Sequence, residues 1–280
     1  MREVVIAAAA RTPIGNFGGA LKDLTPHKMG ELAVREVMAR AELDPGLIDE
    51  VIIGSVGHTS DAYNVARVIA LMAGLPVRTP AYSVQRNCSS GLQPFVNAYQ
   101  NIQSEDADVQ VVGGVESMSR APFVSRDMRW GKRLRHAEFI DSIWEGLTDA
   151  FCGQLMGLTA ENLAEEFNIS HEEQDHFAVE SHRRAFKAIR EGRLKDEVFP
   201  VMVQKTVAGR EVPPVAVVQD EGPNVGLTEQ QLALYPPLFK EGGTVTAGNS
   251  CPLNDGAAAA IVMSGARARD LNHRPLGRIK

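Results

Sequence analysis

The chain has 280 residues, enough for one large domain or two domains of ordinary size. Its 44% hydrophobic and 23% charged residues are typical of a globular protein, and a formal net charge of −6 offers no basic field for nucleic acid or an anionic membrane. The three cysteines have neither the spacing of a disulfide framework nor that of a zinc site, so we expect a reducing compartment and no metal.

Strand-like and helix-like segments alternate through the first part of the chain. The apolar residues 4–10 predict a buried first strand, because the run is short for a signal peptide and follows Glu3. No apolar stretch approaches the length of a membrane span. We therefore expect a cytoplasmic protein that does not enter the membrane.

The alternation continues along the next hundred residues. Thr25 and Pro26 supply a helix N-cap and a first-turn proline, and Gly74 closes a second helix that starts near Asn64. Strands are expected at residues 4–10, 51–53, 81–84 and 109–112, with helices from residue 25, over 64–73 and over 88–102. This βαβαβ order predicts an α/β fold with a largely parallel sheet buried between helices on both faces.

Cys88 stands where the third strand-like run gives way to the third helix-like run. At a helix N-terminus, unpaired backbone N–H groups and the helix dipole favour the reactive thiolate. The position is also the carboxyl end of a strand, where sites form in α/β sheets. A free cysteine is, however, equally common in a protein core. The residues alone leave both a nucleophile and a core cysteine open.

Two glycine-rich segments give weaker signals. The segment 15–19 lacks the spacing of a dinucleotide fingerprint, and no P-loop motif occurs. Gly113 and Gly114 directly follow the fourth strand. We favour a tight turn there over a close approach of two backbones.

The pattern changes after Gly114. Residues 121–248 show no clean alternation, although a capping box from Ser170 to Glu173 predicts one helix that stops at Gly192. The basic residues between 126 and 135 are expected to form a solvated face, and residues 257–263 return to a strand pattern. We expect a sheet domain whose first part is 1–120, an inserted loop domain at 121–248, and at 249–280 a return to the sheet domain and the start of a connection to a further domain.

Several segments together resemble the thiolases, the acyl-CoA acetyltransferases that make or cleave 3-oxoacyl-CoA. The matching segments follow the family order and extend over essentially the whole chain. They are residues 11–15 (RTPIG), 87–93 (NCSSGLQ), 113–119 (GGVESMS), 146–151 (GLTDAF), 156–157 (MG), 159–162 (TAEN), 243–249 (GTVTAGN) and 254–258 (NDGAA).

The resemblance assigns roles to individual residues. Cys88 would be the nucleophile that takes an acyl group from a CoA thioester, with its own N–H as one oxyanion-hole donor. No cofactor beyond the CoA substrates is implied. Leu147 and Met156 would line the pantetheine channel and acyl pocket, although core packing is the alternative for Met156 and Phe239. The remaining residues expected along the CoA are Phe239, Ala247, Ser250 and Cys251.

Three departures from the family pattern affect these expectations. Leu155 stands where the commonest short-chain enzymes have histidine, and the pair Ser250-Cys251 replaces two small residues. Both changes touch the expected acyl and CoA pocket, and they favour a degradative enzyme of fatty acid β-oxidation. Pro94 falls inside the helix expected from Cys88, where a proline would remove a hydrogen bond and kink the first turns.

The family has a second half that this sequence does not match. In that half a histidine activates the nucleophilic cysteine and a second cysteine moves the proton of Claisen condensation, and none of the seven histidines here matches a catalytic motif. We therefore expect the chain alone to be inactive in carbon–carbon chemistry. By the same resemblance the complete form would be a homodimer or homotetramer that uses acyl-CoA and CoA.

Two alternatives remain open. The chain could be a non-catalytic or partner-dependent half-subunit that binds CoA, with the histidine supplied by another chain. It could also be another condensing enzyme such as a ketoacyl-ACP synthase, which shares duplicated βαβαβ halves. The segment 243–249 and the long inserted region argue against that second alternative.

Overall fold

A computed structural model describes residues 1–57, 60–207 and 210–280, so His58 lies outside the described residues. The chain forms two compact units. Unit 1 comprises Met1–Arg120, Leu194–Glu221 and Asn254–Lys280. Unit 2 comprises Ala121–Arg193 and Gly222–Leu253.

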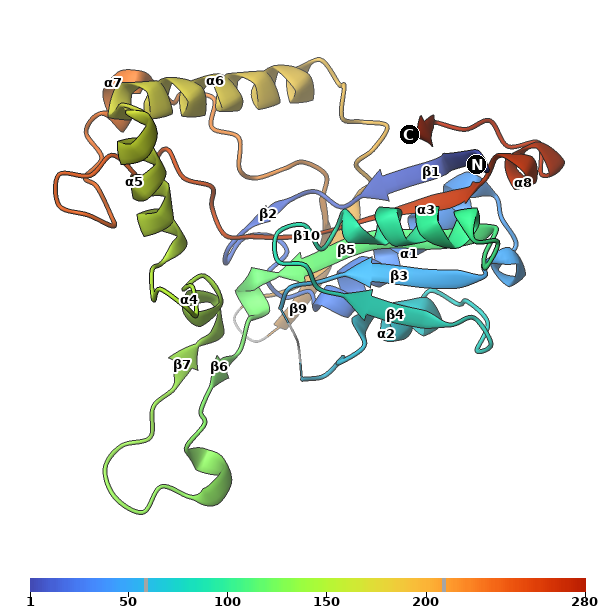
Figure 1. The fold of residues 1–280 in the computed structure, drawn as a ribbon, viewed down its shortest axis with the longest axis horizontal. Coiled ribbons are helices and arrows are strands. Elements are labelled where there is room, and N and C mark those ends of the chain that lie inside the picture. Colours follow the sequence, from blue (N-terminus) through green and yellow to red (C-terminus); the bar gives the residue numbers. More distant parts are fainter. Residues whose placement is uncertain (58–59, 208–209) are drawn as a thin grey trace. The chain divides into compact units, whose positions relative to one another are not determined.

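A seven-stranded sheet is the centre of unit 1 (Figure 1). Its strand order is β11-β1-β10-β5-β3-β4, and the short β2 pairs with β10. The strands are β1 (Val4–Arg11), β2 (Gly15–Asn16), β3 (Glu50–Gly54), β4 (Ala81–Val84), β5 (Val109–Ser117), β10 (Asn254–Ser264) and β11 (Gly277–Ile279).

The sheet is mixed, and the expectation of a largely parallel sheet is wrong. Only β4-β3-β5 is parallel, while β10 pairs antiparallel with both β5 and β1. The chain leaves the sheet at the end of β5 and returns beside the same point, since Asp255 pairs with Ser117. A strand that starts next to the end of its neighbour must run in the opposite direction.

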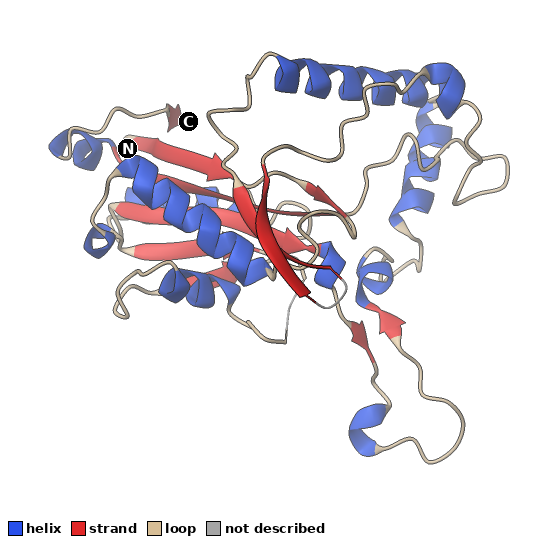
Figure 2. Ribbon diagram, turned by 180° about the vertical axis from the view of Figure 1, so that it is seen from behind, coloured by secondary structure: helices blue, strands red, loops and turns tan. Residues whose placement is uncertain are grey.

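Helices cover both faces of this sheet, as expected (Figures 1 and 2). On one face α1 (Pro26–Ala41) and α2 (Val65–Met72) pack over Val111 and Ile261, and on the other α3 (Gln93–Gln103) packs over Val112 and Val262. Successive strand residues point to opposite faces, so each strand contributes to both cores.

Most expected helix starts are confirmed, but that of α3 is wrong. The Thr25 side chain accepts the Lys28 N–H at the start of α1, and Asn64 caps α2. In contrast, α3 begins at Gln93, and Cys88 lies in the turn before it. Pro94 therefore occupies the first turn, where a proline has no hydrogen bond to remove, and the expected kink does not arise.

An antiparallel hairpin from the middle of the sequence also belongs to unit 1. It consists of β8 (Val201–Val207) and β9 (Arg210–Val217). Val201 and Val203 join the same core as α1 and α2. Unit 1 further contains the 3₁₀ helices η1 (Pro45–Leu47) and η2 (Met118–Arg120) and the helix α8 (Gly265–Asp270).

Unit 2 is built from helices and long loops, with little apolar core. Its buried apolar side chains, among the residues described, are Ala164, Leu232 and Val245. The capping box expected at Ser170 is confirmed, with Ser170 and Glu173 bonded reciprocally at the start of α6. The elements are β6 (Phe123–Val124), η3 (Met128–Trp130), β7 (Ile140–Asp141), α4 (Ser142–Gly146), α5 (Met156–Phe167), α6 (His171–Arg190) and α7 (Glu229–Leu232).

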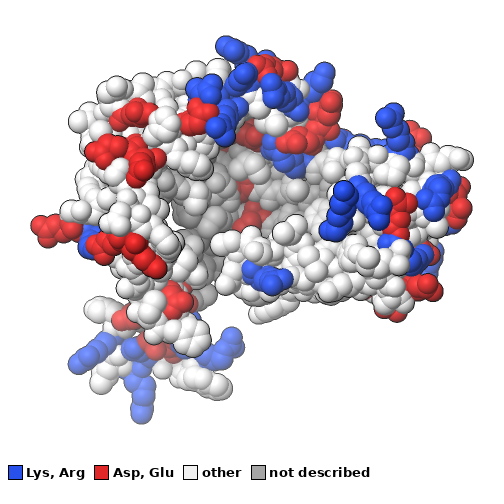
Figure 3. Space-filling model, turned by 45° about the horizontal axis from the view of Figure 1, so that its top comes forward, with Lys and Arg blue, Asp and Glu red and all other residues white. Residues whose placement is uncertain are grey.

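Basic and acidic side chains lie intermixed on the face that Figure 3 shows. Within the basic stretch of unit 2, Arg126 pairs with Glu145 at 2.8 Å and Lys132 pairs with Asp127. These pairs fit the solvated face expected for this stretch. Across the part of the chain that the structure describes, no helix is both long and apolar enough to span a membrane.

Candidate active site

Cys88 lies in a tight turn between β4 and α3. Asn87 has a φ of 48°, a left-handed conformation that asparagine tolerates better than most residues. The buried Ser90 closes the turn, because its hydroxyl accepts the Arg86 N–H at 2.8 Å and donates to the Asn87 carbonyl at 2.7 Å. The turn is therefore held by its own residues, and the cysteine is presented at its tip.

Two glycines on neighbouring strands support this turn. A Cβ on Gly54, the last residue of β3, would stand 1.9 Å from the Ser90 carbonyl oxygen. A Cβ on Gly114 of β5 would stand 3.0 Å from the Gly91 Cα. Gly114 continues its strand, so the tight turn that we favoured there is wrong and the close approach of two backbones is correct. Only glycine lets the turn rest directly on the sheet.

The environment of Cys88 decides one open question. Its side chain is exposed, so the alternative of a buried core cysteine is wrong. The helix that we expected to stabilise a thiolate begins only at Gln93, and a helix dipole acts mainly within the first turn. Exposure does not single out Cys88, because Cys152 and Cys251 are exposed as well. The supporting glycines and the ordered turn distinguish it.

In unit 2 the structure brings three of the expected CoA-binding residues together. The Leu147 carbonyl accepts the Met156 N–H at 3.0 Å, which joins the end of α4 to the start of α5. The Phe239 ring lies against the next residue, since a Cβ on Gly157 would stand 2.3 Å from two ring carbons. Met156 is 45% exposed, so core packing does not account for it.

The remaining expected residues follow on the segment that pairs with Pro237 and Leu238. Leu238 donates its N–H to the Val245 carbonyl at 3.0 Å, and Pro237 forms a bridge with Thr246. Directly after this pairing come Ala247, which is exposed, Ser250, which is half-buried, and Cys251, which is exposed. Residues 147, 156, 239 and 247 are thus linked through contacts within unit 2, whereas Cys88 belongs to unit 1.

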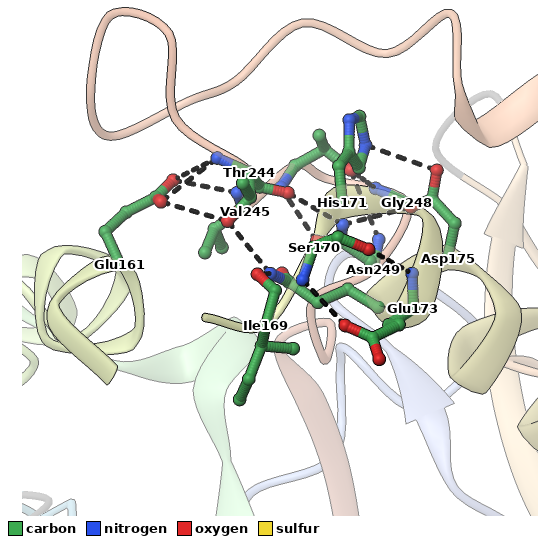
Figure 4. Close-up of polar contacts among 12 residues, drawn as sticks. Glu161, Ile169, Ser170, His171, Glu173, Asp175, Thr244, Val245, Gly248 and Asn249 are labelled. Atoms are coloured by element: carbon green, nitrogen blue, oxygen red, sulfur yellow. Dashed lines mark hydrogen bonds and ion pairs between the residues drawn. The ribbon is translucent and has the colours of Figure 1, made fainter. Parts of the chain in front are cut away.

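Two buried carboxylates in unit 2 were missed by the analysis of the sequence (Figure 4). Glu161 of α5 is 2% exposed and Asp175 of α6 is 3% exposed. Glu161 accepts hydrogen bonds from Thr244 and Val245, and Asp175 accepts one from Asn249. Glu161 stands in the family-like segment 159–162, but its partners lie some eighty positions away. No local spacing could have connected them.

Burial and hydrogen bonding act in opposite directions on Glu161. Burial pushes the pKa of its carboxyl group up, but the donors of Val245 and Thr244 and the charge of Lys240 outweigh this effect and lower the pKa. Glu161 is therefore held as a carboxylate. Within the described ranges, no group of three or more His, Cys, Asp or Glu side chains could hold a metal ion.

Comparison with known proteins agrees with the resemblance noted in the sequence. A family model described as "Thiolase, N-terminal domain" matches residues 4–266. A "Probable acetyl-CoA acyltransferase" of Staphylococcus aureus strain COL is 43% identical over 277 residues, which cover 99% of this chain and 70% of that protein.

Solved structures show the same fold. The crystal structure of the Bacillus anthracis acetyl-CoA acetyltransferase matches with a TM-score of 0.95 and 42% identity, over 100% of this chain and 70% of the other. Human mitochondrial 3-ketoacyl-CoA thiolase in complex with CoA matches with a TM-score of 0.92 and 39% identity, over 99% of this chain and 69% of the other.

Proposed function

Because this chain belongs to the thiolase family, we propose that it is an acyl-CoA acetyltransferase whose Cys88 takes an acyl group from a CoA thioester and passes it on. The observation that carries the proposal is the exposed Cys88 at the tip of an ordered turn resting on Gly54 and Gly114. A nucleophile needs such a fixed and accessible position.

The proposed step exchanges one thioester for another. The Cys88 sulfur, having lost its proton, attacks the thioester carbonyl carbon. The new carbon–sulfur bond replaces the bond to CoA, and the departing CoA thiolate takes up a proton. The overall change is nearly neutral in energy, because the bond broken and the bond formed are of the same kind. In Claisen condensation this acyl group then passes to the carbanion that acetyl-CoA forms when a base removes its proton. In thiolytic cleavage Cys88 instead attacks the 3-oxo carbonyl carbon of a 3-oxoacyl-CoA, the bond between C2 and C3 breaks, and acetyl-CoA leaves and takes up a proton. The acyl group on Cys88 then passes to CoA.

We assign CoA recognition to unit 2. The contacts that join Leu147, Met156 and Phe239, and the pairing that leads on to Ala247, support this assignment. Ser250 and Cys251 are included by the family resemblance. The structure of a relative with CoA, 39% identical to this chain, also supports CoA as the ligand.

Finer properties of the protein are also proposals. Leu155 and the pair Ser250-Cys251 favour degradative use in fatty acid β-oxidation. The family resemblance favours a homo-oligomer, and the spacing of the three cysteines favours a protein of the reducing cytoplasm. The division of the sequence into domains at 1–120, 121–248 and 249–280 remains a prediction as well.

Acylation of the intact chain tests the central proposal. After incubation with acetyl-CoA and digestion, mass spectrometry is expected to find the acetyl group on the peptide that contains Cys88. Cys88→Ser is expected to abolish this label because the hydroxyl of serine is a far weaker nucleophile than a thiolate.

Cys152→Ser is the matched control, since Cys152 is also exposed but has no proposed role, and it should keep the label. Labelling that persists in Cys88→Ser would overturn the proposal. CoA binding without any acylation would instead favour the non-catalytic half-subunit.

A further inference from the structure

The segment 243–251, which carries the proposed CoA contacts Ala247, Ser250 and Cys251, has no regular secondary structure to hold it. Val245 and Thr246 are nevertheless buried, at 6% and 0% exposed. Buried backbone N–H groups need acceptors, and a segment outside a helix or sheet must find them elsewhere. Something in unit 2 must therefore fix this segment.

Glu161 supplies acceptors at the start of the segment (Figure 4). The Thr244 N–H lies 2.9 Å and 3.0 Å from the two carboxylate oxygens, and the Val245 N–H lies 2.8 Å from Oε1. The Thr244 hydroxyl adds a bond of 3.1 Å to Oε2. Hydrogen bonds to an ionised acceptor are the strong ones, so this carboxylate fixes two successive residues of the segment at once.

Gly243, the first residue of the segment, leaves room for this carboxylate. A Cβ on Gly243 would stand 2.4 Å from Glu161 Oε1, so only glycine leaves room for it. Gly157, Glu161 and Glu165 recur every four residues and share one face of α5. This face contacts the Phe239 ring, Thr244 with Val245, and Lys240, respectively. One face of α5 thus contacts the chain at residues 239, 240, 244 and 245.

A second carboxylate fixes the far end of the segment. Asn249 donates to Asp175 of α6 at 3.0 Å and to the Thr244 carbonyl at 3.0 Å, and its own oxygen accepts the Thr246 N–H at 2.8 Å. His171 lies 3.2 Å from the other Asp175 oxygen. Ala247 lies between the two anchored ends, so its position follows from them.

We propose that Glu161 is a positioning residue for CoA binding, which holds the segment 243–251 on α5 and thereby sets where Ala247 and Ser250 meet CoA. The inference rests on the proposed function, because the CoA contacts are themselves part of that proposal. In this proposal Glu161 does not touch CoA; it acts through the backbone of Thr244 and Val245.

Glu161→Gln in the full chain is the direct test. The amide has nearly the same shape, but it carries no charge and turns a donor toward the N–H groups of the segment. Amide hydrogen exchange at residues 244–249 should accelerate at least about tenfold, and the Kd for CoA measured by calorimetry should rise about tenfold, as expected for loss of charged hydrogen bonds. Gly243→Ala, which displaces the carboxylate, should have the same effects.

Glu165→Gln is the matched control. It makes the same change on the same helix face, at a side chain that is 64% exposed and pairs only with Lys240 among the contacts of its carboxylate described here. Its amide exchange at 244–249 and its Kd for CoA should stay within about twofold of wild type. Acetylation of Cys88 by S-acetyl-N-acetylcysteamine, which lacks most of CoA, should be unchanged in both variants. A merely structural role of Glu161 would slow that reaction too.

The outcomes separate the inference from the function it rests on. Unchanged exchange at residues 244–249 in Glu161→Gln overturns the positioning role, whatever happens to CoA binding. Faster exchange with an unchanged Kd for CoA overturns the link between the segment and CoA. If the wild-type chain itself binds no CoA, the proposed function fails, and the exchange data still decide whether Glu161 holds the segment.

Discussion

At the scale of single residues, the position of Cys88 depends on two glycines beneath its turn. Gly54 and Gly114 have no side chain, and the turn 86–92 occupies the space that a Cβ would fill. Within the turn, the Ser90 hydroxyl accepts the Arg86 N–H and donates to the Asn87 carbonyl. The sequence gives Cys88 as the candidate nucleophile, but the role of Gly54 depends on a contact with Ser90, more than thirty positions away in the chain.

Gly54→Ala is expected to displace the turn. Its φ lies outside the left-handed region, so alanine is tolerated by the backbone itself and the cost is steric. Overpacking of this kind should lower the free energy of unfolding by about 1–3 kcal/mol in urea titrations. Movement of Cys88 should slow its acetylation at least about tenfold.

The control for this substitution is Gly277→Ala, also in a strand of the same sheet. A Cβ there meets no atom within 4 Å. Its unfolding free energy should stay within about 0.5 kcal/mol of wild type. Normal acetylation of Cys88 in Gly54→Ala would show that the turn does not need this glycine.

At the scale of elements, short local signals predicted helix starts well and the α3 start poorly. Thr25 with Pro26, and Ser170 with Glu173, are complete local motifs, because cap and partner lie within one turn. The residues from Cys88 to Leu92 continue the apolar and small-residue pattern of the following helix. Their actual conformation is a turn packed on two glycines, and that packing is not visible in the local pattern.

Helix α5 and the segment that it holds should show a characteristic response to acid. The pKa of Glu161 lies below its ordinary value of 4.5 in the folded state. A carboxyl group with a lowered folded pKa stabilises the fold above its unfolded pKa, and this stabilisation is lost as the pH falls through the folded pKa. The groups facing it are Lys240 and, through Lys240, Glu165.

Urea unfolding of wild type and Glu161→Gln from pH 7 to pH 3 measures this contribution. The wild type should be more stable by about 1–3 kcal/mol at neutral pH, because glutamine leaves buried N–H groups without an acceptor. The difference should stay constant down to about pH 4.5 and shrink below it. A difference that grows on acidification would contradict the lowered pKa.

At the scale of the whole molecule, the two units are stabilised by different means. Unit 1 buries a large apolar core on both faces of its sheet. Unit 2 buries few apolar side chains among the residues described and is held largely by polar contacts such as those of Glu161 and Asp175. Apolar burial is the main stabilising contribution in folding, so the units should differ in stability.

Unit 2 is therefore expected to unfold at a lower urea concentration than unit 1. Hydrogen exchange followed by mass spectrometry in increasing urea should show α5 and α6 losing protection before β5 and β10. Peptides from α1 serve as the control, because α1 packs on the core of unit 1. Loss of protection in all these elements at a single urea concentration would contradict the prediction.

The sequence by itself determined the family, because several short segments match it in order along the chain. It also determined the α/β alternation, the nucleophile candidate and the helices with complete caps, because each of these is encoded in residues close together in the chain. The tertiary structure alone decided the mixed direction of the sheet, the turn at Cys88 and the anchoring of the segment 243–251. These features arise from contacts between distant residues, and a carboxylate or a glycine reveals nothing of its partner until the chain has folded.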